Sequence, residues 1–589
     1  MLRMLVEDGD LVERGGRLEP LAAVNSLRVP ETVQAVLAAR LDRLDEEERA
    51  VLQRAAVIGH VFWWGAVAEL SPPEEVGKVA GRLQALVRKG LIKPDVRTFA
   101  GEDGFRFGHT LIRDAAYDSM PKRLRAELHE RFASWAEQRA GDRIDLDEII
   151  GHHLERAYSL RVELGPAGSH ETTLAGRAAD NLARAGRRAL ARDDAHAAAN
   201  LLGRAAALRP GNAPLLLDHA DAHAQLGAIA IAESEFRAAL DAAVAAGDRR
   251  TEICARLELG MIRLLSRAEG RVDEQAAEVE RALPLFEQSG DDATVARLLM
   301  RLAEAFWWRC QIVAMQDVLE RALEHARRAG DERQGANIAV RLGFAAIVGP
   351  LPVEQGRQLL ADAIEQARDG TSAKGMLLLT GSLLAALDGD LAAARRLCSE
   401  GSETLDALGR SVGLAAVTTW TAAVDLLAGD AASAERDLRA ALAHLEAVGQ
   451  HANAASVAAQ LAETLLVAGR FEEAVALTIQ SENAAGHDDV HAQIAWRVAR
   501  AKACAALGDG DAEQTAAAAV ELAYDTDSPL YTADALEALS IALAAAGRDE
   551  DAAAAARDAL HLYESKGHAA GAERIRNGRA AVRTASPPG

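Results

Sequence analysis

The feature that most constrains the fold is a short signal that recurs about every 40 residues through the second half of the chain. It consists of a small or apolar pair, a glycine, and then Asp or Arg, as in LAGD ending at Asp430 and VAGR ending at Arg470. The glycines of this series are Gly389, Gly429, Gly469, Gly508 and Gly547. A period of this length is typical of solenoids built from helix pairs. A second series, from Gly247 to Gly449, lies half a period away and predicts two helices per period.

The segment after each glycine of the first series carries a stripe of small and apolar residues. Counting five and nine residues on from Gly429 gives Ala434 and Leu438, and the same count from Gly547 gives Ala552 and Ala556. These offsets place side chains on one helical face, where small residues let neighbouring helices approach closely. Glycine suits the left-handed position that ends the preceding helix. We predict about ten helix pairs over residues 181–575 and a disordered tail over 576–589.

The composition also favours helix. Apolar residues make up 49% of the chain but aromatic residues only 4%, so most of the apolar content is Ala with Leu and Val. Ala loses no side-chain entropy in a helix, and Leu, Arg, Glu and Gln lose little. The sequence therefore argues against an all-β fold and against a parallel α/β fold.

The first part of the chain has a different pattern. Residues 1–26 contain two short strand-like runs, which are too little to fold alone. Residues 27–120 begin with helical patterns, including Pro30 at a helix start and Asp45 with Glu48 as an N-terminal capping box. Two strand-like runs follow, at 91–94 and 104–107, and three helices followed by a hairpin is the order of a winged helix. Residues 121–180 are predicted to be linking helices.

The charge of the chain disfavours two classes of partner. The sequence has 66 Lys and Arg against 88 Asp and Glu, a net charge of −22. Such a balance repels nucleic-acid phosphates and anionic membranes unless a local basic patch overrides it. Residues 27–125 contain 16 basic and 14 acidic residues, so nearly all the negative charge lies on the repeats. We expect neither nucleic acid nor a membrane as a partner.

The cysteines and the apolar runs indicate a cytoplasmic protein. The four cysteines, at positions 254, 310, 398 and 504, are too few and too scattered for a disulfide framework or a paired-Cys metal site. Cys398 falls in the small-residue stripe after Gly389, so we interpret it and the other three as core residues. The first residues are too acidic for a signal peptide, and no apolar run reaches the ~18 residues of a membrane span.

Catalytic motifs are absent from the sequence. It has no Walker A loop, no H-E-x-x-H, no G-x-S-x-G and no paired CxxC. His152 and His153 lie on adjacent helix faces and cannot both point at one metal, so we interpret them as packed or solvent-facing. Phe62, Trp63 and Trp64 are interpreted as core rather than as a partner-binding cluster. We predict no enzyme, no metal site and no cofactor bound by this chain alone.

Several stretches also carry a family resemblance. They are RVPETVQAVLAARLDRL, AAVIGHVFWWGAVAEL, FRFGHTLIRDAAYDSM, RAELHERFASWAEQ and EIIGHHLERAY. Together they resemble the region after the nucleotide-binding domain of bacterial STAND-type AAA ATPases. These proteins are often fused behind a class III adenylate/guanylate cyclase domain and followed by tetratricopeptide-like repeats. The resemblance implies a mainly α fold, with a winged-helix domain followed by a tetratricopeptide-like α-solenoid of about ten helix pairs.

The resemblance also implies where nucleotide chemistry would lie. Residues 1–26 resemble the end of an AAA ATPase domain, and in the family the P-loop and cyclase modules lie before the position of Met1. ATP or ADP and Mg²⁺ are therefore implied only for such an upstream domain, acting in cis or in trans. In related switch ATPases a winged-helix His near a strand end senses bound ADP, and His109 is the matching position.

Three functions follow from these observations. The leading hypothesis is a regulatory and scaffolding signalling protein, whose repeat superhelix binds a protein partner or ligand on its concave face and controls an associated ATPase or cyclase module. The first alternative is a winged-helix DNA-binding transcriptional regulator, although residues 27–125 lack the basic excess of a groove-reading module. The second alternative is a fragment of an ATP-binding adenylate cyclase.

Overall fold

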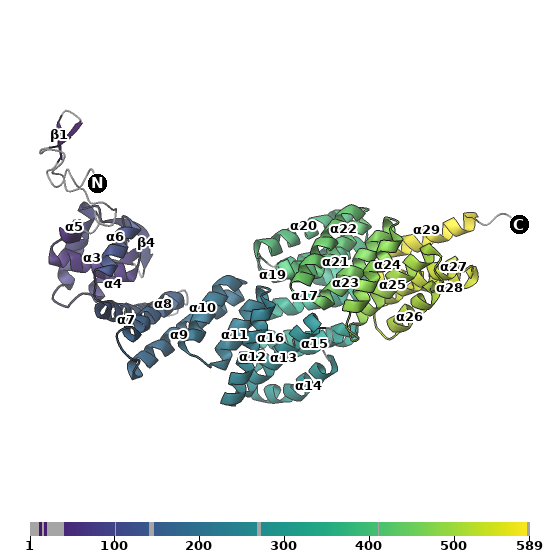
Figure 1. Cartoon of the computed structure of the whole chain (residues 1–589), viewed down its shortest axis with the longest axis horizontal. Helices are drawn as coiled ribbons and strands as arrows, with labels where there is room; N and C mark the ends of the chain where they lie inside the picture. The colour runs from purple at the N-terminus through teal and green to yellow at the C-terminus, as the bar shows by residue number, and fades with distance from the viewer. Residues whose placement is uncertain are drawn as a thin grey trace. The chain divides into compact units, whose positions relative to one another are not determined.

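The computed structural model describes residues 11–14, 17–20, 41–99, 102–140, 146–267, 272–409 and 411–585. Most of these residues lie in helices (Figure 1), as the composition predicts. Contacts divide the chain into two compact units. Unit 1 is Met1–Arg187 with Asn200–Pro210, and unit 2 is Arg188–Ala199 with Gly211–Gly589.

Unit 1 contains a short hairpin near its beginning. Strand β1 (Leu11–Arg14) pairs antiparallel with β2 (Arg17–Pro20). The rest of residues 1–26, and the helix predicted to begin near Pro30, lie outside the described residues.

Helices and a three-stranded antiparallel sheet follow in unit 1. The elements are α3 (Glu46–Ile58), β3 (Val61–Trp63), α4 (Trp64–Glu69), the 3-10 helix η2 (Val76–Lys78), α5 (Val79–Arg88), β4 (Ile92–Phe99) and β5 (Glu102–Phe107). The strand order is β3-β5-β4, so β5 is the central strand. The two strand-like runs of the sequence correspond to β4 and β5. The third strand, β3, is only three residues long and was not predicted.

The predicted capping box begins α3. The Asp45 carboxylate accepts a hydrogen bond of 2.7 Å from the Glu48 backbone N–H, and the Glu48 carboxylate accepts one of 3.4 Å from the Asp45 backbone N–H. The two side chains thereby satisfy two backbone donors that the first turn of a helix leaves free.

The aromatic run at β3 is only partly core. Phe62 is fully buried and packs against Phe107, with ring centroids 5.4 Å apart. Trp64 is 38% exposed, so the interpretation of all three aromatics as core is wrong at this position. Successive residues of a strand face opposite sides, and in β3 it is Phe62 that faces the core. Trp64 is the first residue of α4, so its direction is not set by this alternation.

Four helices connect this part of unit 1 to the repeats. They are α6 (Thr110–Asp118), α7 (Lys122–Ala140), α8 (Asp147–Val162) and α9 (Ser169–Ala191). Residues 121–180 are therefore largely helical within the described residues, as predicted. The predicted boundary at residue 181 falls inside α9, however, because the Ala- and Arg-rich sequence there contains no helix breaker.

The remaining helices continue the repeat to the end of the described residues (Figure 1). They are α10 (Ala195–Leu208), α11 (Ala213–Gln225), α12 (Ile229–Ala246), α13 (Arg249–Arg267), α14 (Val272–Ser289), α15 (Asp292–Trp308), α16 (Ile312–Ala329), α17 (Glu332–Val348), α18 (Val353–Gln366), α19 (Ser372–Leu387), α20 (Leu391–Ala407), α21 (Ser411–Leu427), α22 (Ala431–Ala447), α23 (His451–Val467), α24 (Phe471–Ala484), α25 (Val490–Leu507), α26 (Ala512–Tyr524), α27 (Pro529–Ala545), α28 (Asp549–Lys566) and α29 (Ala569–Ala585). From α11 to α28 these helices make nine successive pairs, and the two helices of each pair are in contact. In the part of the chain that the structure describes, no helix is long and apolar enough to cross a membrane.

The glycine register of the sequence has a direct structural counterpart. All five glycines of the first series have positive φ, from +72° to +89°, which is the left-handed conformation that favours glycine. The stripe residues that follow them are buried: Ala434, Leu438, Ala552 and Ala556. Glycine ends one helix, and the next helix packs its small residues into the core.

The odd-numbered helices of unit 2 lie on the inner side of the repeat stack. Each odd-numbered helix from α11 to α25 contacts the next odd-numbered helix as well as the even-numbered helix between them. Helices ten places apart also touch, α13 with α23 and α17 with α27. In a curved solenoid the helices inside the curve approach each other most closely. Unit 2 is therefore coiled tightly enough for helices five pairs apart to meet.

Charged side chains also join segments about five helix pairs apart, and they do so at the ends of α16 and α17. The Asp527 carboxylate accepts hydrogen bonds of 2.6 and 2.8 Å from the backbone N–H groups of Ile312 and Val313, which begin α16. The buried Lys566 ammonium donates hydrogen bonds of 2.6 to 2.8 Å to three backbone carbonyls. One is in the last turn of α17, at Ala346, and two directly follow that helix, at Gly349 and Leu351. An anion at a helix N-terminus and a cation at a C-terminus are the favourable arrangements. We call these contacts the inter-turn clasp.

The end of the chain differs from the prediction. Residues 576–589 were expected to be a disordered tail, but α29 continues to Ala585. Ala572 and Ile575 anchor its first half in the core, and the following Arg and Ala residues are good helix formers. Residues 586–589 lie outside the described residues.

Candidate functional site

A ladder of ion pairs runs across the inner helices of unit 2. Arg297 on α15 contacts Asp221 on α11 at 2.5 Å and Glu258 on α13 at 3.3 Å. Arg301, one turn further along α15, contacts Glu258 at 3.0 Å and Glu304 at 2.5 Å. The ladder ends where Arg341 on α17 contacts Glu304 at 3.2 Å. We call this set the arginine ladder.

Electrostatics keep most of the ladder charged. Burial alone would raise the pKa of Glu258, but Arg301 and Arg297 hold it below its ordinary value. Burial opposes the charge of Arg301, yet Glu258 and Glu304 raise its pKa. Burial raises the pKa of Asp221 against the pull of Arg297. In such pairs the attraction between opposite charges offsets the free-energy cost of removing each charge from water.

In each pair of the ladder the arginine is the more exposed partner. Arg341 is 37% exposed against 11% for Glu304, and Arg297 is 30% exposed against 18% for Asp221. Arg301 is 21% exposed against 11% for Glu258. The arginine side chains of the ladder are therefore more open to solvent than the acidic side chains with which they pair.

An aromatic cluster adjoins the Arg341 end of the ladder. The Arg341 guanidinium lies 5.1 Å from the centre of the Phe344 ring. Phe344 packs edge-on against Trp420 at 4.5 Å and lies 5.9 Å from Trp307. Both tryptophans are only partly buried. They come from α21 and α15, so the cluster belongs to the same inner series of helices as the ladder.

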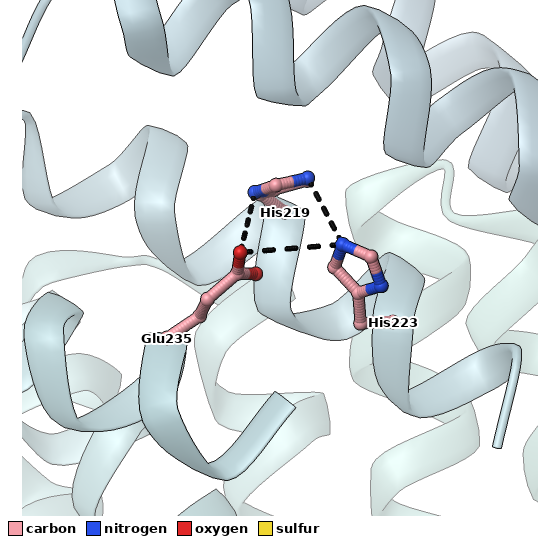
Figure 2. A group of neighbouring side chains, drawn as sticks. All are labelled: His219, His223 and Glu235. Carbon is pink, nitrogen blue, oxygen red and sulfur yellow. Dashed lines mark hydrogen bonds and ion pairs between the residues drawn. The ribbon is translucent and has the colours of Figure 1, made fainter. Parts of the chain in front are cut away.

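A second cluster of side chains lies between the first two helices of the repeats in unit 2. Figure 2 shows His219 and His223 on α11 facing Glu235 on α12. His219 Nδ1 lies 3.1 Å from Glu235 Oε1, and His219 Nε2 lies 3.2 Å from His223 Nε2. His223 Nε2 lies 4.0 Å from Glu235 Oε1, and the two contacts of His219 come from opposite nitrogens of its ring. These are metal-ligand residue types brought together by two elements.

The sequence prediction of no metal site overlooked this cluster. The signal was available in DHADAHAQ, where two histidines four residues apart occupy one face of a helix. The third member, Glu235, was not recognisable, because its approach to the histidines depends on how α12 folds back on α11. Spacing within one helix is visible in a sequence, whereas the partner from the next helix is not.

His109, the predicted nucleotide-sensing residue, caps a helix. Its Nδ1 accepts a hydrogen bond of 3.2 Å from the Leu111 backbone N–H, at the beginning of α6. The side chain is exposed. Arg113 pairs with its neighbour Asp114 at 3.5 Å in the same helix. The nucleotide-sensing role of His109 stays a prediction.

The two adjacent histidines of α8 have different surroundings, as their place on adjacent faces requires. His152 is exposed, whereas His153 is buried with its Nδ1 2.9 Å from His129 Nδ1. His129 Nε2 in turn lies 2.9 Å from the Tyr117 hydroxyl. Burial lowers the pKa of His129 to about 3, so this imidazole is neutral at physiological pH. These side chains border a cleft of about 610 Å³ in unit 1, which Arg113 also lines.

The cysteines are poor nucleophiles. Three of them are buried and Cys398 is partly buried. Burial raises the pKa of all four thiols. A thiol is reactive as its thiolate, so a raised pKa disfavours nucleophilic chemistry. Cys398 packs beside Leu379 and Leu405, as its position in the small-residue stripe predicted.

Comparisons with known proteins yield structural neighbours. No family model matches the chain, and no curated protein matches it. It is similar to a STAND ATPase with a tetratricopeptide repeat sensor from Pyrococcus horikoshii, at 14% identity and a TM-score of 0.34, over 71% of this chain and 66% of that one. It is similar to a Rap protein complexed with competence and sporulation factor, at 12% identity and a TM-score of 0.45, over 60% and 98%. It is similar to yeast Tom70 at 12% identity and a TM-score of 0.30, over 80% of this chain and 98% of Tom70.

These likenesses carry no argument about function at such identities and TM-scores. The chain matches 66% of the length of the STAND protein. The helical-repeat fold is seen in the helices of the chain itself.

Proposed function

We propose that this chain is a regulatory scaffold whose repeat unit binds a protein partner on the inner faces of α15, α17 and α21. The observation that supports this most is Arg341 beside Phe344, Trp307 and Trp420. Only 4% of the chain is aromatic, yet two partly buried tryptophans meet here next to Arg341, whose side chain is 37% exposed. Arg and Trp are the residues that dominate binding energy at protein interfaces.

The arginine ladder favours an acidic segment as the bound part of the partner. Its arginine side chains are more exposed than the acidic side chains that they pair with. Guanidinium groups match carboxylates in a planar, two-pronged geometry. The net charge of −22 opposes acidic partners at long range. At physiological salt, however, charges are screened beyond about 8 Å, so the local arginines decide the contact.

A selection from random peptides tests this binding function. The full chain is incubated with a random-sequence peptide pool, and the bound fraction is sequenced by mass spectrometry. We expect Asp- and Glu-rich peptides in the bound fraction of the wild type and their loss from that of Arg341→Gln. Glu304 keeps its contact with Arg301 in this variant, so the ladder is not left with an unpaired carboxylate.

Arg321→Gln is the matched control. Arg321 on the outer helix α16 pairs with Glu287 at 3.3 Å, so the substitution also removes one arginine from an Arg–Glu pair. The control should bind the same peptides as the wild type. Equal loss in both variants, or no acidic peptides bound by the wild type, would rule out the inner face as the binding surface.

We further propose a winged-helix domain in unit 1. Its support is the element order α3, β3, α4, α5, β4, β5, with β5 central in the sheet. Under the resemblance to STAND-type ATPases, this domain and the repeats would control an ATPase or cyclase module in cis or in trans. The chain would then bind no nucleotide by itself and would not be an enzyme. ATP turnover by the isolated chain above background would contradict this assignment.

His109 provides the test of the nucleotide-sensing hypothesis. In a complex with an ATPase domain of this type, His109→Ala should weaken ADP binding. The variant removes a side-chain cap as well, so His109→Asn, which retains a capping side chain, separates the two roles. Wild-type ADP affinity in both variants would assign His109 to capping alone.

A further inference from the structure

We propose that His219, His223 and Glu235 form a binding site for one divalent transition-metal ion, with Zn²⁺ as the favoured ion. The site lies between α11 and α12, within a single helix pair of unit 2 (Figure 2). The inference concerns different residues from the proposed binding face and does not depend on it.

The geometry suits a shared ion. Two ligand atoms that each lie about 2.1 Å from one ion cannot be more than ~4.2 Å apart. Only one nitrogen of His219 can face a shared ion, and the 3.1 Å contact uses its Nδ1 whereas the 3.2 Å contact uses its Nε2. With one ligand atom from each residue, the three atoms lie within 4.8 Å of one another, so binding requires a small side-chain rotation to bring every pair within this limit. The 3.2 Å between the two histidine Nε2 atoms is also close to the ~3.4 Å expected for neighbouring ligands in a tetrahedron of this size.

Two elements bring the ligands together. His219 and His223 are one helical turn apart on α11, so they project from the same face. The chain then turns at Gly227, whose φ is +73°, and α12 returns Glu235 to that face. Glu235 precedes Phe236, which is buried in the core, so the carboxylate sits at the edge of the buried stripe of α12.

Two atoms of the cluster lack a hydrogen-bond partner among the described residues. They are the buried Glu235 Oε2 and the buried His223 Nδ1. A buried polar atom without a partner is costly, and most such atoms in native proteins have one. An ion bound by both carboxylate oxygens would satisfy Glu235 Oε2, which the hydrogen bonds within the cluster do not.

The ligand set selects the class of ion. Mg²⁺ and Ca²⁺ prefer oxygen ligands throughout, whereas Zn²⁺ takes imidazole nitrogen together with carboxylate oxygen. Two histidines and one glutamate are three protein ligands, which leave a fourth tetrahedral position open. That position can hold water or a side chain from a partner. The bound ion would tie α11 to α12 next to Asp221, the first member of the arginine ladder.

Metal titration of the full chain tests the proposal. The untagged chain is stripped with a chelator, dialysed, and titrated with ZnCl₂ in a calorimeter. We expect one tightly bound equivalent of Zn²⁺ and no measurable binding of Mg²⁺. Co²⁺ should give the visible absorption of a tetrahedral complex. Glu235→Gln and His223→Gln should each weaken Zn²⁺ binding at least about tenfold.

His561→Gln is the matched control, since His561 is exposed on α28, far along the chain from the cluster. It should bind Zn²⁺ as the wild type does. Circular dichroism establishes that each variant is folded. The wild-type titration alone decides the main point, even if a variant fails to fold. Absence of a tight Zn²⁺ equivalent would overturn the proposal and leave a chain of hydrogen bonds from Glu235 through His219 to His223. Undiminished binding in both folded ligand variants would overturn it as well.

Discussion

At the scale of single residues, the glycines of this chain have two different physical roles. Gly429 ends a helix with a φ of +82°, and nothing lies within 4 Å of the position that a Cβ would take there. Gly401, within α20, instead permits close helix packing. A Cβ there would lie 2.8 Å from the Gly375 carbonyl oxygen of α19. Both roles are visible as spacings, since Gly401 lies twelve residues after Gly389 in the stripe of small residues.

Gly401→Ala should destabilise the chain by overpacking, by about 1–3 kcal/mol in the free energy of unfolding. Gly413→Ala is its counterpart. Gly413 also lies inside a helix, α21, but a Cβ there would have nothing within 4 Å. It should stabilise the chain by about 1 kcal/mol, because Ala is the better helix former. Urea unfolding measures both, and equal effects of the two substitutions would contradict the close approach of α19 and α20.

Asp489 should make stability depend on pH. Burial raises the pKa of its carboxyl group to about 7, whereas in the unfolded chain it is about 3.9. Between these values the folded state binds more protons than the unfolded state, so stability falls as pH rises from about 4 to about 7. Asp489→Asn still offers an oxygen to the Ala492 backbone N–H but carries no charge. The free energy of unfolding of this variant, relative to that of the wild type, should therefore be at least ~1 kcal/mol higher at about pH 8 than at about pH 5.

The exposed helix cap Asp430 is the control for this measurement. It accepts a hydrogen bond of 3.0 Å from the Ser433 backbone N–H, and this bond lowers its pKa. Asp430→Asn should therefore show no such gain at the higher pH. The explanation for Asp489 fails if its Asn variant follows the wild-type pH profile.

At the scale of elements, the inter-turn clasp joins helices about five pairs apart. Lys566→Met should lower the free energy of unfolding by about 1–3 kcal/mol, because it leaves buried carbonyls without a donor. Three carbonyl oxygens, those of Ala346, Gly349 and Leu351, would lose the Lys566 ammonium. Hydrogen exchange should also become faster at the end of α17, far from the substitution in sequence.

Lys374→Met provides the matched control for this exchange measurement. Lys374 likewise donates to backbone carbonyls at a helix end, those of Ile364 and Ala367, but they are its neighbours along the chain. Its effect should stay within α18 and α19. Wild-type exchange at the end of α17 in Lys566→Met would show that the clasp does not hold the turns together.

The sequence predicted the elements better than their distant contacts. Helix pairs, their glycine ends and the buried stripe all follow from local spacing, so they were recognisable. The end of α29 was missed because the tail shows no apolar period, although its Ala and Arg residues favour helix. Asp527 and Lys566 gave no signal at all. Their partners lie 214 to 220 residues away, and no period in the sequence connects them.

At the scale of the whole molecule, unit 2 departs from a simple linear repeat. In an ideal solenoid each repeat contacts only its neighbours, and stability is a sum of local terms. Here α13 touches α23 and α17 touches α27. A partner that binds the inner helices therefore acts on several repeats at once. This coupling is a physical basis for regulation, because a ligand shifts an equilibrium only through its different affinity for two states.

The candidate binding face could be anticipated only in general terms. A repeat fold predicts a partner on its inner side, and that expectation needed no structure. The arginine ladder and the aromatic cluster combine residues from α11, α13, α15, α17 and α21. Which of the many charged residues face inward depends on the rotation of each helix. Glycine spacing does not fix that rotation closely enough to identify Arg341 or Trp420.

Hydrogen-exchange mass spectrometry of the full chain, with and without an acidic peptide recovered from the selection, tests the central claim most directly. The account predicts slower exchange in α15, α17 and α21 when the peptide is present, and no such slowing in Arg341→Gln. Protection confined to the outer helices α14, α16 and α18, or the same protection in Arg341→Gln as in the wild type, would contradict it.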